Sequence, residues 1–139
     1  LYRDVVAACG GIKERVQLGK VIFGGPMMGG AAPGLDYPVL KQNNGLILLS
    51  RKAAAVPEPG PCIRCGRCIT ACPMGLEPVL IAEAFEQKDY EALEKRSVDL
   101  CVSCGSCTFA CPAKRLISQN TTLAKAWYLK TKKEKAGKS

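Results

Sequence analysis

The sequence contains no histidine, which removes the side chain most often used as a general base and a common zinc ligand. No apolar run approaches the roughly 18–20 residues that a membrane-spanning helix needs. Aromatic residues make up 6% of the chain, and no aromatic recognition motif accompanies its basic residues, so no nucleic acid is predicted as a partner. Because no nucleophile can be paired with a histidine, we predict no catalytic residue.

Cysteine, in contrast, is abundant, with nine residues in a chain of 139. The odd count and the tight spacing of most of these cysteines are unfavourable for a disulfide framework. Clustered cysteines in a cytosolic chain more often bind metal. The composition therefore predicts reduced, metal-bound thiolates.

Positive charge is concentrated at the end of the chain. The net charge is +8, but residues 1–113 carry 12 Lys/Arg against 11 Asp/Glu, and residues 114–139 carry 8 against 1. Residues 119–139 are predicted to form a basic helical tail. This tail could be a solvated helix, or it could dock on a membrane surface or membrane subunit, for which Trp127 and Tyr128 beside lysines would be suited.

The pattern of apolar residues predicts an α+β chain, beginning with a partial β-grasp-like α/β unit over residues 1–55. Residues 4–9 read as a short helix that buries Leu1, Val5 and Cys9 on one face. Residues 20–23 and 46–49 read as strands, and GGPMMGG at 24–30 reads as a tightly packed turn. One helix and two strands cannot close a core, and Leu1 is not an initiator methionine, so we expect the chain to be part of a longer protein.

The second half of the chain is predicted to be mainly helical. Residues 56–61 form a proline-rich linker, residues 62–118 hold most of the cysteines, and residues 119–139 are the basic tail. Asp89 is placed to cap a short helix. Apolar helical faces are predicted at Leu80, Ile81, Ala84 and Phe85, and at Leu123, Ala126 and Trp127.

The strongest signal is an internal repeat. PCIRCGRCITACP at 61–73 and LCVSCGSCTFACP at 100–112 have the same cysteine spacing at a constant offset of 39. The run C-x2-C-x2-C-x3-C-P is typical of bacterial ferredoxins with two [4Fe–4S] clusters, in which the fourth cysteine binds the other cluster. Structural zinc sites fit less well, since they usually take two ligand pairs a dozen or more residues apart.

The spacing thus predicts two [4Fe–4S] clusters with crossed fourth ligands and a function in electron relay. Cluster one is assigned to Cys62, Cys65, Cys68 and Cys111, and cluster two to Cys101, Cys104, Cys107 and Cys72.

The segments KVIFGGPMMGG and NNGLILLS, followed by the two cysteine runs, together resemble the C subunit of the Rnf (Rsx) electron transport complex. The resemblance implies that residues 1–55 end a soluble-ligand-binding β-grasp domain, and that a helical twin-cluster ferredoxin domain follows it. It also implies FMN and NADH sites upstream of Leu1, because these residues hold no flavin or nicotinamide motif.

The resemblance further implies a peripheral subunit on the cytoplasmic side of the bacterial inner membrane. Its partners would be the other Rnf subunits and ferredoxin, in a translocase that couples electron transfer between ferredoxin and NAD to transport of Na⁺ or H⁺. The alternative is the relay of a soluble flavoprotein, such as the cobalamin reductase of microcompartments, which is similar in the same region.

Overall fold

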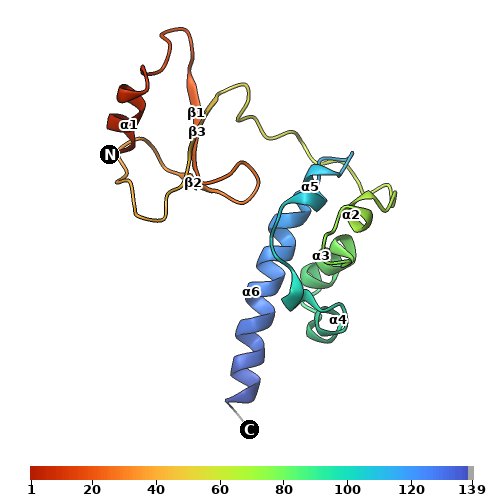
Figure 1. Ribbon diagram of the computed structural model, residues 1–139. Helices are drawn as coiled ribbons and strands as arrows, with labels where there is room; N and C mark the ends of the chain where they lie inside the picture. Colours follow the sequence, from red (N-terminus) through yellow and green to blue (C-terminus); the bar gives the residue numbers. More distant parts are fainter. Residues whose placement is uncertain (138–139) are drawn as a thin grey trace. The chain divides into compact units, whose positions relative to one another are not determined.

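The computed structural model describes residues 1–137, and the chain divides into two compact units (Figure 1). The first unit comprises Leu1–Pro57, and the second begins at Glu58. Each unit is described by itself below.

The first unit is one helix and a small antiparallel sheet. Its elements are α1 (Tyr2–Ala8), β1 (Leu18–Phe23), β2 (Gly30–Ala32) and β3 (Leu46–Ser50). The strand order is β2-β1-β3, so β1 is central, and its Val21 is only 3% exposed. The two predicted strands therefore lie within β1 and β3.

Strand β2 is not among the predicted strands, because its three residues carry no side chain larger than a methyl group. A close backbone approach holds it beside β1. A Cβ atom on Gly30 would lie 2.4 Å from the Phe23 ring, and one on Gly29 would lie 2.5 Å from the Phe23 carbonyl oxygen. The glycines that follow the two methionines are thus required for tight packing.

The predicted buried face of the first helix is wrong. Tyr2 and Val6 are buried, whereas Leu1 and Val5 are 49% and 41% exposed and Cys9 is also exposed. The helix is held by the Tyr2 side: the Tyr2 amide donates to the Tyr37 carbonyl at 2.9 Å, and its hydroxyl donates to Asn43 Oδ1 at 3.2 Å. These contacts turn the four-residue series containing Cys9 toward solvent.

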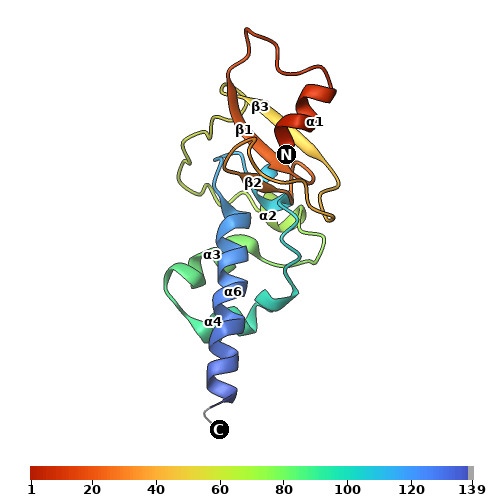
Figure 2. The ribbon, with the colours of Figure 1, turned by 90° about the vertical axis from the view of Figure 1, so that its left-hand side faces the viewer.

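The second unit is helical (Figure 2). It contains α2 (Arg67–Thr70), α3 (Pro78–Glu86), α4 (Tyr90–Lys95), the 3₁₀ turn η1 (Val98–Leu100), α5 (Ser106–Phe109) and α6 (Ile117–Ala136). Helix α6 packs against α3, α4 and η1. The core of the unit comprises Leu76, Ile81, Ala84, Leu93, Val98, Ala124 and Tyr128. None of the helices described is long and apolar enough to cross a membrane.

Two local predictions for this unit are confirmed. Asp89 is the N-cap of α4, and its Oδ1 accepts a hydrogen bond from the Ala92 amide at 2.9 Å. In α3, Ile81 and Ala84 are buried in the core and Phe85 packs against it.

The apolar face predicted for the last helix is wrong. The buried residues of α6 are Ile117, Thr121, Ala124 and Tyr128, whereas Leu123 is 50% exposed. Thr121 belongs to the buried face although it is polar, because its hydroxyl hydrogen donates to the Ser118 carbonyl oxygen at 3.1 Å.

The aromatic residues of this helix also belong to the interior of the unit. Tyr128 stacks on Tyr90 with ring centroids 4.9 Å apart, and Trp127 meets Phe85 edge to face at 6.3 Å. Neither ring projects freely as a membrane anchor would. Residues 138 and 139 of the predicted tail lie outside the described residues.

Candidate metal centre

The sequence repeat is also a structural repeat in which paired elements begin 39 residues apart. Helix α2 corresponds to α5, and α3 corresponds to the start of α6. Left-handed backbone conformations recur in the same register, at Arg64 and Ser103, Gly66 and Gly105, and Gly75 and Lys114. The two cysteine loops therefore share a backbone path as well as a spacing.

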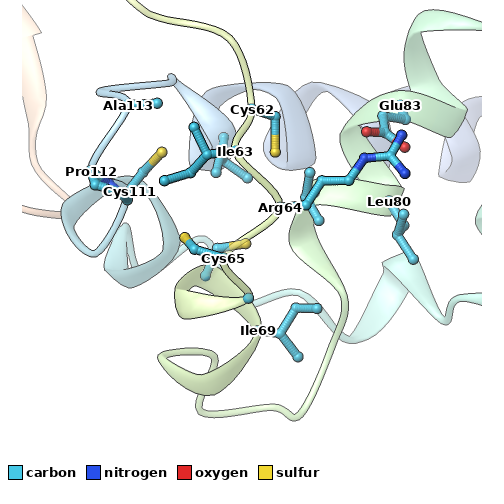
Figure 3. A pocket seen from close by; sticks show the side chains of 14 residues that line it. Cys62, Ile63, Arg64, Cys65, Ile69, Leu80, Glu83, Cys111, Pro112 and Ala113 are labelled. Atoms are coloured by element: carbon cyan, nitrogen blue, oxygen red, sulfur yellow. The ribbon is translucent and has the colours of Figure 1, made fainter.

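The first candidate site is a cavity of about 240 Å³ (Figure 3). Three cysteines from the first run line it, and Cys111 from the second run completes the set. The other lining residues are mainly apolar, as Val79, Leu80 and Ile117 are. Figure 3 shows the Arg64 side chain extending toward Glu83 at one side. The first-run cysteines are Cys62, Cys65 and Cys68.

The second candidate site mirrors this arrangement. Three cysteines of the second run and Cys72 from the first run line a cavity of about 20 Å³. Leu76 and Ile81 also line it and belong to the core of the unit. The second-run cysteines are Cys101, Cys104 and Cys107.

All eight of these thiols are free of disulfide bonds, and the donor sets suit an iron–sulfur cluster, which takes one cysteine sulfur at each of its four irons. Within residues 1–137, no three Cys, Asp or Glu side chains gather closely enough to hold one metal ion. The thiols instead surround the two cavities. Because the second cavity is much smaller, its thiols would have to move apart around a cluster.

The structure thus brings Cys111 to the first-run thiols and Cys72 to the second-run thiols. The assignment of these residues as ligands stays a prediction. Cys9 is in the other unit and belongs to neither set.

The thiols differ in acidity. Burial raises the pKa of Cys107 to about 11 and also raises the pKa of Cys68. The pKa of Cys104 is lowered, chiefly by its side-chain hydrogen bond with Ser106. A lowered pKa means that the surroundings favour the thiolate, the form that binds metal.

Sequence reasoning missed the hydroxyl groups around the second cavity. Ser106 Oγ lies 3.4 Å from Cys104 Sγ, and Thr121 Oγ1 lies 3.8 Å from Cys101 Sγ. Further hydroxyl pairs are Thr108 with Ser118 at 2.9 Å and Thr122 with Ser103 at 3.0 Å.

An alignment of the two halves at offset 39 would have found these hydroxyls. The six residues of the first half are charged or apolar, whereas their six counterparts in the second half all carry hydroxyls. The pairs are Arg64 and Ser103, Arg67 and Ser106, Ile69 and Thr108, Val79 and Ser118, Ala82 and Thr121, and Glu83 and Thr122.

Comparison with known proteins agrees with this geometry. Residues 61–115 match the family model described as a 4Fe-4S dicluster domain, which implies two [4Fe–4S] clusters.

Curated relatives share more of the chain, and each of them is the C subunit of a membrane-bound type of complex named for ion translocation. For the Na⁺-translocating ferredoxin:NAD⁺ oxidoreductase complex of Acetobacterium woodii, the identity is 38% over 96 residues, which is 69% of this chain and 21% of that protein. For the proton-translocating counterpart of Clostridium ljungdahlii, it is 42% over 99 residues, covering 71% and 21%. For the ion-translocating oxidoreductase complex of Rhodobacter capsulatus, it is 39% over 94 residues, covering 66% and 17%. The matches thus span about a fifth of these relatives.

Proposed function

We infer the function of this chain from its descent: it is a homologue of the C subunit of ion-translocating (Rnf-type) oxidoreductase complexes and carries a 4Fe–4S dicluster domain. We propose that it is the electron-transfer module of such a ferredoxin:NAD⁺ oxidoreductase complex. The transport of Na⁺ or H⁺ would be carried out by the complex as a whole. FMN and NADH would bind to the part of the full-length protein that these residues do not include.

In this proposal, the cysteines around each cavity hold one [4Fe–4S] cluster. Cys62, Cys65, Cys68 and Cys111 bind the first, and Cys72, Cys101, Cys104 and Cys107 bind the second. Each cluster, when bound, takes up and releases one electron. The protein supplies the thiolates, the apolar walls that limit water, and the hydrogen-bond donors near the sulfurs.

One observation carries this proposal: each cavity is lined by four thiols, and each set draws on both cysteine runs. Two clusters bound in this way require about eight irons and eight sulfides per chain. Chemical analysis after anaerobic purification measures both, and dithionite should bleach the brown colour of the protein.

The matched control is Cys9→Ser, since Cys9 is the cysteine outside both cavities. It should leave the iron and sulfide contents unchanged. Folded, colourless protein containing zinc in place of iron would refute the proposed function.

We propose that the protein is peripheral on the cytoplasmic side of the bacterial inner membrane, with other subunits of the complex and ferredoxin as its partners. Contact with the membrane surface would come from exposed lysines of α6 and not from its aromatic rings. Some of these lysines are engaged locally, since the Lys135 ammonium lies 3.8 Å from the centre of the Tyr90 ring. Lys130 and Lys133 are exposed and are the better candidates.

Sedimentation with vesicles tests this membrane contact. Replacing Lys130 and Lys133 by glutamine should reduce binding of the chain to phosphatidylglycerol vesicles, because the attraction of lysines to anionic lipid is lost. The matched control is Lys88→Gln in the α3–α4 turn. Equal binding by both variants would remove the membrane contact from the proposal.

A further inference from the structure

The two cavities differ in the groups that can hydrogen-bond to cluster sulfur. Such hydrogen bonds, together with charge and solvent exposure, set the reduction potential of an iron–sulfur cluster. A donor stabilises the reduced cluster more than the oxidised one, because the reduced cluster carries one more negative charge. The cavity with more donors therefore favours the higher potential.

Ser106 is the clearest donor at the second cavity. Its Oγ lies 3.4 Å from Cys104 Sγ, and its hydroxyl has no other hydrogen-bond partner among the described side chains. Once Cys104 is a metal-bound thiolate it can only accept, so the serine hydroxyl must be the donor. The hydroxyl is therefore free to point at the sulfur.

Thr121 is the second donor, and a weaker one. Its Oγ1 lies 3.8 Å from Cys101 Sγ and 3.1 Å from the Ser118 carbonyl oxygen. One hydrogen serves two acceptors, so the contribution to Cys101 should be smaller than that of Ser106. Thr121 is 1% exposed, so water does not compete for this hydroxyl.

The first cavity has no equivalent arrangement. Arg67 and Ala82 stand where the second half has Ser106 and Thr121. Among residues 1–137, no side-chain hydroxyl hydrogen-bonds to a thiol of the first cavity.

Charge does not reverse the comparison. Arg64 and Arg67 beside the first cavity are exposed, and the charge of an exposed group is screened by water and salt. Figure 3 also shows the Arg64 side chain extending toward Glu83, an opposite charge. At the second cavity, the partly buried Lys125 ammonium donates to the Cys101 carbonyl oxygen at 2.8 Å. The less screened cation is thus at the second cavity.

Burial does not reverse it either. The first cavity has two buried thiols, Cys68 and Cys111, and an exposed one, Cys65. The second has one buried thiol, Cys107, and three of intermediate exposure. Neither set is clearly the more solvated, so the direct hydrogen bonds decide the order.

Resting on the function proposed above, we propose that the second cavity holds the cluster of higher reduction potential, because the Ser106 and Thr121 hydroxyls face its sulfurs. An electron then passes from a reduced cluster in the first cavity, which is oxidised, to an oxidised cluster in the second, which is reduced. The first cavity is the entry side of the module and the second is the exit side.

A redox titration of the anaerobically purified chain, followed by electron paramagnetic resonance, tests this order. Cys62→Ser and Cys101→Ser each remove one thiol from one cavity and thereby assign the two signals. We expect the signal lost in Cys101→Ser to have the higher midpoint potential.

Ser106→Ala and Thr121→Val then test the cause. A hydrogen bond to a charged acceptor is worth about 1.5 kcal/mol at the lower end of its range. Ser106→Ala should therefore lower the reduced-to-oxidised ratio of cluster two about tenfold at fixed ambient potential, which is about 59 mV for one electron. Thr121→Val should lower the ratio less. The control is Thr122→Val, whose hydroxyl is bonded to Ser103 and not to a cysteine.

Outcomes against the inference can be told apart from failure of the proposed function. A chain that assembles no clusters refutes the function and is recognised from its iron content. A chain with two clusters of equal or inverted midpoint potential refutes only the order. A shift in Ser106→Ala no larger than that in Thr122→Val refutes the role of the hydroxyls.

Discussion

The two cavities of the helical unit share one backbone design but differ in their walls. Their cysteine loops have the same spacing, the same left-handed positions and the same helix starts. The first cavity, however, lies beside a small apolar cluster of Cys68, Cys107, Cys111 and Ile117, whereas the second is built into the main core through Leu76 and Ile81. Duplication preserved what places the thiols, and the remaining positions diverged into two environments.

The largest expected effect comes from exchanging the crossed cysteines. Cys72→Ser should disturb cluster two, because Cys72 lines the second cavity, and Cys111→Ser should disturb cluster one. Each variant should retain about four of about eight irons if the remaining cluster persists. Iron analysis combined with electron paramagnetic resonance of the two signals checks this.

If Cys72→Ser instead disturbed cluster one, the ligands would not be crossed. The two cavities would then each belong to one run, and the comparison between them would have to be redrawn.

A core substitution should affect the second cavity far more than a surface substitution affects the first. Leu93 is completely buried in the core that the second cavity adjoins, so Leu93→Ala should cost about 2–5 kcal/mol in free energy of unfolding. Ile63 lines the first cavity but is 65% exposed, so Ile63→Ala should change it by about 0.5 kcal/mol or less. Anaerobic denaturant titration measures both, and comparable losses would show that the first cavity is as firmly built as the second.

The smallest effect concerns a position where the repeat is imperfect. Gly75 and Lys114 are equivalent, with φ of 64° and 56°, but only glycine adopts this conformation without cost. Lys114→Gly should therefore stabilise the second half by up to about 1 kcal/mol, and Gly75→Lys should destabilise the first half by a similar amount. Melting temperatures of the two variants should shift in opposite directions, and shifts of the same sign would contradict a shared backbone design.

The parts of the fold that sequence could predict are those with strong local chemistry. The cysteine spacing, the Asp89 cap and the apolar runs of β1 and β3 each act through neighbouring residues. Strand β2 could not be predicted, since it is held by the close approach of Gly30 to the Phe23 ring and not by its own side chains.

The buried faces of α1 and α6 depend on distant partners. Tyr2 is fixed by Asn43, and Tyr128 packs on Tyr90, so helical periodicity alone favoured the wrong residues. At the site, the eight cysteines were predictable, but their hydroxyl neighbours come from α5 and α6, and only the fold shows which of them reach a sulfur.

The sharing of thiols between the cysteine runs also constrains when the site can be completed during synthesis. Cys62 is made 49 residues before Cys111, a delay of roughly 2–10 s on a translating ribosome. Until Cys111 emerges, the first cavity lacks one wall and its three earlier thiols stay exposed to oxidants. The nascent chain must therefore be kept reduced until the second run has been made, and cofactor insertion belongs to the last stage of folding.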